Sequence, residues 1–234
     1  MLRVFGMTVL AGLCALPASF ALKGKDVAES KSVPAVVLVA AENQKKRVRS
    51  VSSGCLLSPT VALTAAHCVD DSDGFSVQAP YSKTPREVVK GTKVVLHPKF
   101  KSKEFENDIA LVFLEKPIEI EGEYPTLFKG DRLRLDTKLV IHGRVLNGEL
   151  SFAKMFAASG EIVAYPGNIN IYGGFPQRAQ PGDSGGPIFV NGHPSIIVAI
   201  VSGMMGFSRR NIETDAYLPI NPDLRKWIVE QMTE

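Results

Sequence analysis

Short runs of apolar and β-branched residues recur along the chain, and Gly, Pro, Asn or Asp separate them. Each run has the length of a single strand. The predicted strands cover residues 33–39, 54–57, 61–64, 88–95, 109–114, 138–142, 160–164, 187–190, 196–201 and 217–220. This spacing favours antiparallel barrels or sandwiches over alternating β-α-β units, so an all-β class is expected.

The end of the chain follows a different period. Leu224, Trp227, Ile228 and Met232 fall on one face of a helix, and Asn221 precedes them as a capping residue. Pro222 suits the first turn of such a helix. We therefore predict one C-terminal helix that packs through this face.

Length and composition narrow the choice of architecture. The chain has 234 residues, 45% of them apolar and 22% charged, with 20 Gly and 15 Pro, which excludes a disordered or collagen-like chain. Residues 115–136 are rich in loop-forming Pro and Gly. We place a boundary between two halves near residue 125.

The first 21 residues have the features of a signal peptide. Arg3 precedes an uncharged apolar stretch, and Ser19 and Ala21 occupy the −3 and −1 positions of a cleavage site. A membrane anchor is the alternative. Cleavage leaves residues 22–234 and changes the net charge from +3 to +2, because only Arg3 is lost. We expect a secreted or periplasmic chain that binds neither nucleic acid nor, after cleavage, a membrane.

Two cysteines, Cys55 and Cys68, lie outside this leader. An even pair in an exported chain predicts one disulfide. Two isolated cysteines cannot supply the four ligands of a structural zinc site. No metal or other cofactor is therefore expected.

Three segments carry candidate chemistry. Ser184 lies in the glycine-rich segment 181–187, which taken alone fits a plain turn. A serine hydroxyl becomes a nucleophile only when a base removes its proton and a carboxylate orients that base. The chain offers His67 at the end of an apolar strand and Asp108 at the start of another.

These segments, in the order His, Asp, Ser, resemble the trypsin-like (chymotrypsin-fold) serine proteases. Segments 33–39, 54–58, 96–100 and 201–203 and the C-terminal Trp227 are similar to that family as well. The resemblance implies two six-stranded antiparallel β-barrels with the active site between them, followed by the helix. It also implies a secreted serine endopeptidase that acts through an acyl-enzyme.

The family assigns roles to the matching residues. His67 is the general base and acid, Asp108 orients it, and Ser184 is the nucleophile. The backbone N–H groups of Gly182 and Ser184 form the oxyanion hole. Ser202 is expected near Asp108.

Specificity by the same resemblance rests on five residues. The backbone of Ser202, Gly203 and Met204 pairs with the substrate as an added strand. Arg178 aligns with the floor of the specificity pocket and Asp215 with its second floor position. Arg178 alone favours acidic side chains, whereas an Arg178–Asp215 pair leaves a small or apolar preference. Both interpretations stay open.

Activation in the family uses a freed α-ammonium that pairs with the Asp before the nucleophile, here Asp183. Counting along the family pattern places that terminus at Leu22, the residue that signal cleavage exposes.

Cys55 and Cys68 match the bridge beside the catalytic histidine. The expected partners are a polypeptide substrate and a protein inhibitor, with the chain as a monomer. The alternative function is a catalytically silent homologue that binds a partner through the cleft.

Overall fold

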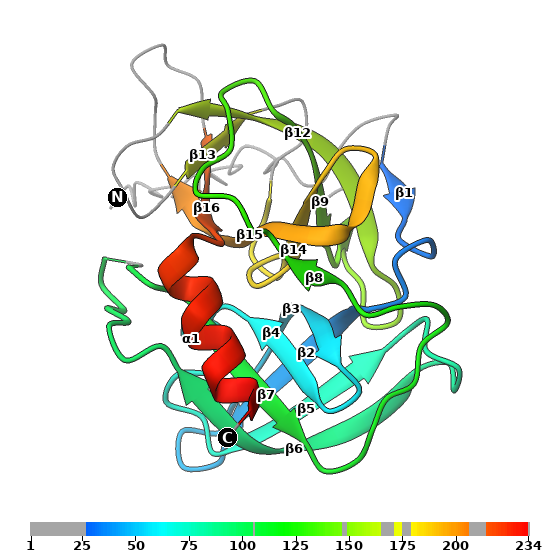
Figure 1. The fold of residues 1–234 in the computed structure, drawn as a ribbon. Helices are drawn as coiled ribbons and strands as arrows, with labels where there is room; N and C mark the ends of the chain where they lie inside the picture. Colours follow the sequence, from blue (N-terminus) through cyan, green and yellow to red (C-terminus); the bar gives the residue numbers. More distant parts are fainter. Residues whose placement is uncertain are drawn as a thin grey trace, which may run out of the picture.

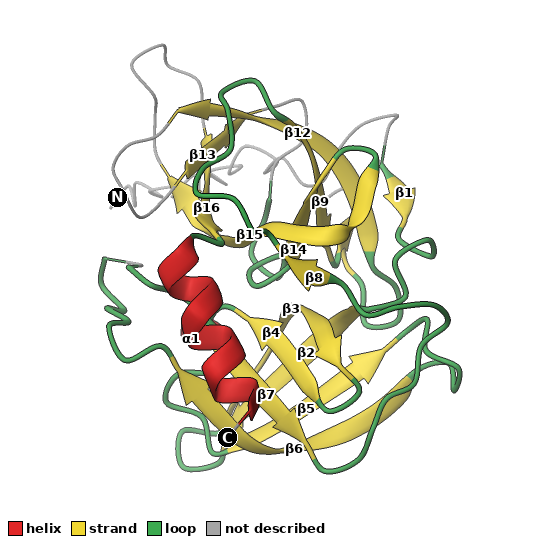
Figure 2. Ribbon diagram, viewed as in Figure 1, coloured by secondary structure: helices red, strands yellow, loops and turns green. Residues whose placement is uncertain are grey.

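The computed structural model describes residues 27–104, 106–146, 149–164, 171–174, 179–205 and 214–233. Figure 1 and Figure 2 show two strand-built bodies stacked on each other, with one helix along their side. The predicted all-β class with two barrels and a C-terminal helix is confirmed. The predicted signal peptide, Leu22 and Arg178 lie outside the described residues.

The first barrel is a closed ring of antiparallel strands in the order β2-β3-β4-β7-β6-β5. Its strands are β2 (Val36–Asn43), β3 (Val48–Ser58), β4 (Val61–Thr64), β5 (Gly74–Ala79), β6 (Glu87–Leu96) and β7 (Ala110–Leu114). Side chains of β4 and β7 meet in register inside it, and Leu63 and Leu111 are both fully buried. The 3-10 helix η1 (Ala66–Cys68) follows β4 directly, so the barrel wall fixes the position of His67.

The second barrel closes through the pairing of β9 with β12. Its ring contains β9 (Lys138–Gly143), β12 (Phe156–Ala164), β13 (Ile171–Gly174), β14 (Pro187–Val190), β15 (His193–Met205) and β16 (Thr214–Pro219). Two short strands attach to it, β1 (Ala28–Glu29) on β12 and β8 (Thr126–Leu127) on β15. The hairpin β10 (Val145–Leu146) and β11 (Glu149–Leu150) projects from the end of β9.

Helix α1 (Pro222–Thr233) joins the two bodies. The Asn221 side chain accepts a hydrogen bond from the N–H of Leu224 at 2.9 Å, as a capping residue does. The chain leaves β16 of the second barrel, and Leu224 and Ile228 are buried in a core cluster that contains most of the first barrel's buried residues together with several from the second. Trp227 meets His97 edge to face, 4.8 Å between ring centres. The predicted capping residue and packing face are thus confirmed.

The strand predictions differ from the structure at one strand start and at several missed strands within the described residues. The segment 33–39 begins as a strand only at Val36, because the N–H of Val36 bonds the carbonyl of Val33 in a turn. Strands β5 and β13 were missed, and so were the two-residue strands β1, β8, β10 and β11. In β5 the signal is present, since Phe75, Val77 and Ala79 alternate with polar residues, but its apolar residues are few.

Candidate active site

His67 and Asp108 form a bonded pair on the first barrel. The Asp108 Oδ2 atom lies 2.7 Å from His67 Nδ1, and its Oδ1 accepts the His67 backbone N–H at 2.9 Å. Ser202, on β15 of the second barrel, donates its hydroxyl to the same Oδ2 at 2.6 Å. Asp108 is fully buried, so these contacts replace the water around its charge. Because a carboxylate only accepts, it holds the Nδ1–H tautomer and leaves Nε2 to face the cavity described below.

The surroundings of His67 favour its charged form. Burial of the ring opposes protonation, but the hydrogen bonds with Asp108 and Cys68 and their charges outweigh it and raise the pKa of His67 to about 10. The Sγ atom of Cys68 lies 3.5 Å from Nε2. The thiol therefore contacts the ring nitrogen that a general base needs free.

Ser184 lies in a tight turn over residues 181–185, directly before β14. Gly182 has φ of +110°, and an added Cβ would come within 2.5 Å of Leu150 Cδ2, so glycine is required there. Strand β3 holds this turn from the first barrel. Ser53 donates its N–H to the Ser184 carbonyl and its hydroxyl to the Gly182 carbonyl, both at 2.9 Å.

The turn leaves two backbone donors available. The N–H of Asp183 bonds Gln180 O at 2.8 Å and that of Gly185 bonds Val201 O at 2.7 Å. The N–H groups of Gly182 and Ser184 have no acceptor among the described residues. Two adjacent free donors of this kind can hold a negatively charged oxygen.

Asp183 is completely buried beneath the turn. Its Oδ1 accepts the N–H groups of Arg144 and Val145 at 2.8 and 2.9 Å, and its Oδ2 accepts that of Gln180 at 3.0 Å. Burial raises the pKa of Asp183 to about 7 even though these hydrogen bonds oppose the shift. The carboxylate is therefore held by backbone donors, and its burial removes the water that would otherwise solvate it.

A cavity of about 210 Å³ brings the groups from both barrels together. Its lining residues are His67, Ala179, Gln180, Pro181, Ser184, Val201, Ser202 and Gly203. Behind this wall, buried Asp215 accepts the Ala179 N–H at 2.8 Å. Ser202 and Gly203 of β15 border the cavity, and the next residue, Met204, pairs with Asp215 of β16.

The predicted disulfide is not formed in this structure. Cys55 on β3 and Cys68 on η1 are both buried and free. The sulfur of Cys68 is engaged with the ring of His67 instead. Burial raises the pKa of the Cys55 thiol, so this group stays protonated.

Sequence reasoning missed two residues that hold the Ser184 turn, Ser53 and Arg144. Ser53 contacts Gly182, 129 positions away in the chain, and Arg144 contacts Asp183, 39 positions away. Neither belongs to a local motif, so the sequence carries no signal for them. The meeting of the two barrels places Ser53 on the turn, and the pairing of β9 with β14 within the second barrel places Arg144 there.

Comparisons with known proteins agree with this geometry. The trypsin family model matches residues 22–138, half of the chain. Trypsin-3 of Salmo salar is 26% identical over 203 residues, covering 77% of this chain and 82% of the relative. An uncharacterized peptidase of Corynebacterium glutamicum is 26% identical over 201 residues, covering 75% and 62%.

Solved structures show the same fold. The structure titled "Structure of GrC" superimposes with a TM-score of 0.74 at 15% identity, covering 89% of this chain and 98% of the other. The structure titled "HL collagenase structure at 1.7A resolution" gives 0.73 at 19% identity, covering 88% and 96%. The fold thus belongs to the class of chymotrypsin-like double barrels. The chain belongs to the trypsin family of serine proteases.

Proposed function

We propose that the chain is a serine endopeptidase with the triad His67, Asp108 and Ser184. One observation carries the proposal: His67 of one barrel, bonded to buried Asp108, and Ser184 of the other line the same cavity. Nothing but the packing of the two barrels brings these groups together. The free N–H groups beside Ser184 supply the charge stabilisation that acyl transfer needs.

The geometry supports a two-step reaction. The Ser184 hydroxyl attacks the scissile carbonyl while Nε2 of His67 takes its proton, and the N–H groups of Gly182 and Ser184 hold the resulting oxyanion. His67 then protonates the leaving amine, and the peptide bond breaks to give the acyl-enzyme. Water then attacks the ester of the acyl-enzyme while His67 takes its proton. His67 returns the proton to the Ser184 oxygen as the acid product leaves. Asp108 keeps the ring oriented throughout and stabilises the imidazolium.

Substrate selection is proposed for the cavity wall and the strand beside it. Ser202, Gly203 and Met204 lie at the end of β15, where an extended polypeptide could add as a further strand. Arg178 and Asp215 set the primary preference. An unpaired Arg178 selects acidic side chains, whereas a pair with Asp215 leaves small or apolar ones.

A library of peptides separates these two cases. Either case predicts little cleavage after Lys or Arg. Arg178→Ala should erase an acidic preference, or uncover a basic one if Asp215 had been its partner. Dominant cleavage after Lys or Arg by the wild-type enzyme would contradict both and would indicate that Asp215, rather than Arg178, determines the preference.

The proposed function includes export of the chain and cleavage of its leader. Residues 1–21 act as a signal peptide, so the mature domain of residues 22–234 begins at Leu22 outside the cytoplasm. Its α-ammonium pairs with Asp183, and Cys55 and Cys68 form a disulfide in the oxidising compartment. The mature enzyme acts on polypeptides as a monomer and is open to a protein inhibitor. No helix among the described residues is long and apolar enough to cross a membrane.

Hydrolysis of a casein substrate by the mature chain tests the proposed function, with Ser184→Ala as the matched control. The wild-type chain should cleave it and the variant should not. Equal cleavage by both would place the activity elsewhere. No cleavage by a folded wild-type chain across many peptides would favour the silent homologue that binds a partner through the same cleft.

A further inference from the structure

Arg144 is a buried cation beside the Ser184 turn. Its side chain is only 1% exposed, and among the described residues it is the only Lys or Arg that is buried. Burial lowers the pKa of Arg144, while the charge of Asp183 raises it. A guanidinium is costly to bury, and replacing it by an apolar side chain is often neutral for stability. Its presence at this place therefore needs a reason other than packing.

The contacts of Arg144 reach three parts of the molecule. Its backbone N–H donates to Asp183 at 2.8 Å. Its Nε donates to the Ser151 carbonyl at 2.9 Å, and the N–H of Ser151 donates back to the Arg144 carbonyl at 2.8 Å. Its Nη1 donates to the Val51 carbonyl of the first barrel at 2.6 Å. One residue thus connects the carboxylate under the turn, the hairpin β10–β11 and strand β3.

The hairpin that Arg144 holds lies on Gly182. Leu150 of β11 occupies the space that a Cβ on Gly182 would need, and the Cδ of Arg144 lies 3.7 Å from that position. The guanidinium is in turn covered by Phe152, with its carbon 4.5 Å from the ring centre. A shift of Arg144 would therefore move the atoms that pack against Gly182.

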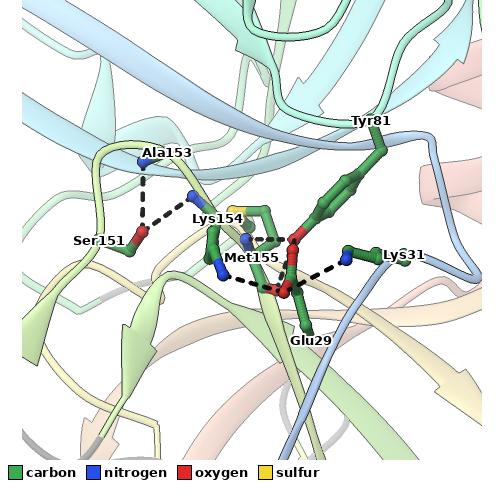
Figure 3. A network of polar contacts seen from close by, with 7 residues as sticks. All are labelled: Glu29, Lys31, Tyr81, Ser151, Ala153, Lys154 and Met155. Carbon is green, nitrogen blue, oxygen red and sulfur yellow. Dashed lines mark hydrogen bonds and ion pairs between the residues drawn. The ribbon is translucent and has the colours of Figure 1, made fainter.

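The segment after the hairpin is anchored in its own right (Figure 3). Ser151 Oγ accepts the N–H of Lys154 at 2.8 Å, and the Lys154 ammonium pairs with Glu29 at 3.1 Å. The Tyr81 hydroxyl of the first barrel bonds both the N–H and the carbonyl of Met155 at 3.0 Å. Ser151 is therefore a fixed acceptor for Arg144, and the Arg144 side chain bridges two rigid bodies.

One nitrogen of the Arg144 guanidinium remains without a hydrogen bond to any described residue. Its Nη2 is buried and has no hydrogen-bond partner in the described part of the chain. An unsatisfied charged donor costs stability, and such groups persist where another requirement outweighs that cost. This observation sets Arg144 apart from an ordinary structural arginine.

We propose that Arg144 is a positioning residue for the oxyanion hole: by tying the β10–β11 hairpin and Asp183 to strand β3, it holds the N–H of Gly182 in its working direction. This inference rests on the proposed protease function. Arg144 touches neither the nucleophile nor the general base, so its effect passes through the turn. It acts on the stabilisation of the oxyanion, which exists only in the transition state, and not on the binding of the substrate.

Kinetics of Arg144→Met and Arg144→Lys test the inference, with Arg225→Met as the matched control. Arg225 is a partly buried arginine of α1 whose Nη1 also donates to a carbonyl, that of Phe128 at 2.8 Å. Removing one oxyanion donor costs about 10²–10³ in kcat, so a misdirected donor should cost about 10–100-fold. We expect this loss in kcat for Arg144→Met with little change in KM, partial recovery in Arg144→Lys, and an unchanged kcat for Arg225→Met.

Amide hydrogen exchange gives a second measurement that does not depend on activity. Arg144→Met should speed exchange in residues 182–186, and Arg225→Met should not. A folded Arg144→Met variant with wild-type kcat and exchange overturns the inference, as does a loss confined to KM. If Arg144→Met does not fold, Arg144→Lys decides, and wild-type kcat and exchange there overturn the inference. An inactive wild-type chain contradicts the proposed function alone, because the exchange result still decides the role of Arg144.

Discussion

The contact between Cys68 and His67 predicts that the Cys55–Cys68 bridge controls the pH range of activity. A general base works only when it is neutral, so activity rises as pH increases through the pKa of His67. With Asp108 bonded to Nδ1 and the Cys68 sulfur 3.5 Å from Nε2, that pKa is about 10. The sulfur raises the pKa of His67 through its ionised form, which attracts the imidazolium. Forming the bridge removes this ionisable group and withdraws the share of the shift that Cys68 causes, so the pKa falls toward the ordinary value for histidine.

The two pKa values set an upper limit on the effect. At pH 7.5 a ring with a pKa of about 10 is neutral in about 0.3% of molecules, and one with the ordinary value of about 6.5 in about 90%. The bridge can therefore raise kcat/KM at pH 7.5 by at most about 300-fold. Asp108 raises the pKa of His67 in the bridged form and in the free-thiol form alike. The observed change in kcat/KM should therefore be smaller than this limit.

Two cysteine variants isolate the cause. Cys55→Ala keeps the Cys68 thiol beside His67, whereas Cys68→Ala removes it, and neither can form the bridge. The pH profile of kcat/KM should have its acid limb at higher pH in Cys55→Ala than in Cys68→Ala. Oxidised wild type should match Cys68→Ala, and treatment with a thiol reductant should move it toward Cys55→Ala. Coincident acid limbs in the two variants would refute the reasoning.

Three further changes have defined outcomes. Asp108→Asn should keep the fold and lower kcat about 10⁴-fold, measured on an activated ester, because the amide favours the wrong His67 tautomer. Tyr81→Phe removes the hydroxyl that bonds both polar groups of Met155, and should lower the free energy of unfolding by about 1–2 kcal/mol in urea titrations. An added methionine before Leu22 should leave a folded but nearly inactive chain, and full activity would show that Leu22 is not needed for the oxyanion hole.

Local pattern was enough to predict much of the fold. The range 61–64 coincides with β4, because Val, Ala, Leu and Thr are all buried in one short run. The terminal helix was predicted from its period and its Asn221 cap, both of which depend on neighbours in sequence. Strand β5 was missed because its alternating pattern holds few apolar residues, and its pairing with β2 and β6 secures the strand in the folded chain.

The residues of the candidate site also fall into two groups, those that a sequence motif identified and those that it did not. Segments with a strong family resemblance pointed to His67, Asp108 and Ser184. His67 and Ser184 line one cavity, and Asp108 is bonded to His67. Residues without a motif were missed, such as Arg144, whose partners come from both barrels. The closing of the cavity depends on contacts between segments more than a hundred positions apart, as in the bond from Ser53 to Gly182.

Covalent labelling of Ser184 tests the central claim most directly. A fluorophosphonate reacts with an activated serine when the oxygen attacks phosphorus and fluoride leaves, so the intact mass shows the adduct and peptide mapping shows its position. The account predicts one adduct, on Ser184, in the mature wild-type chain, and a rate lowered by orders of magnitude in His67→Ala. No adduct on the folded wild-type chain, or equal labelling of His67→Ala, would contradict the claim that His67 activates Ser184.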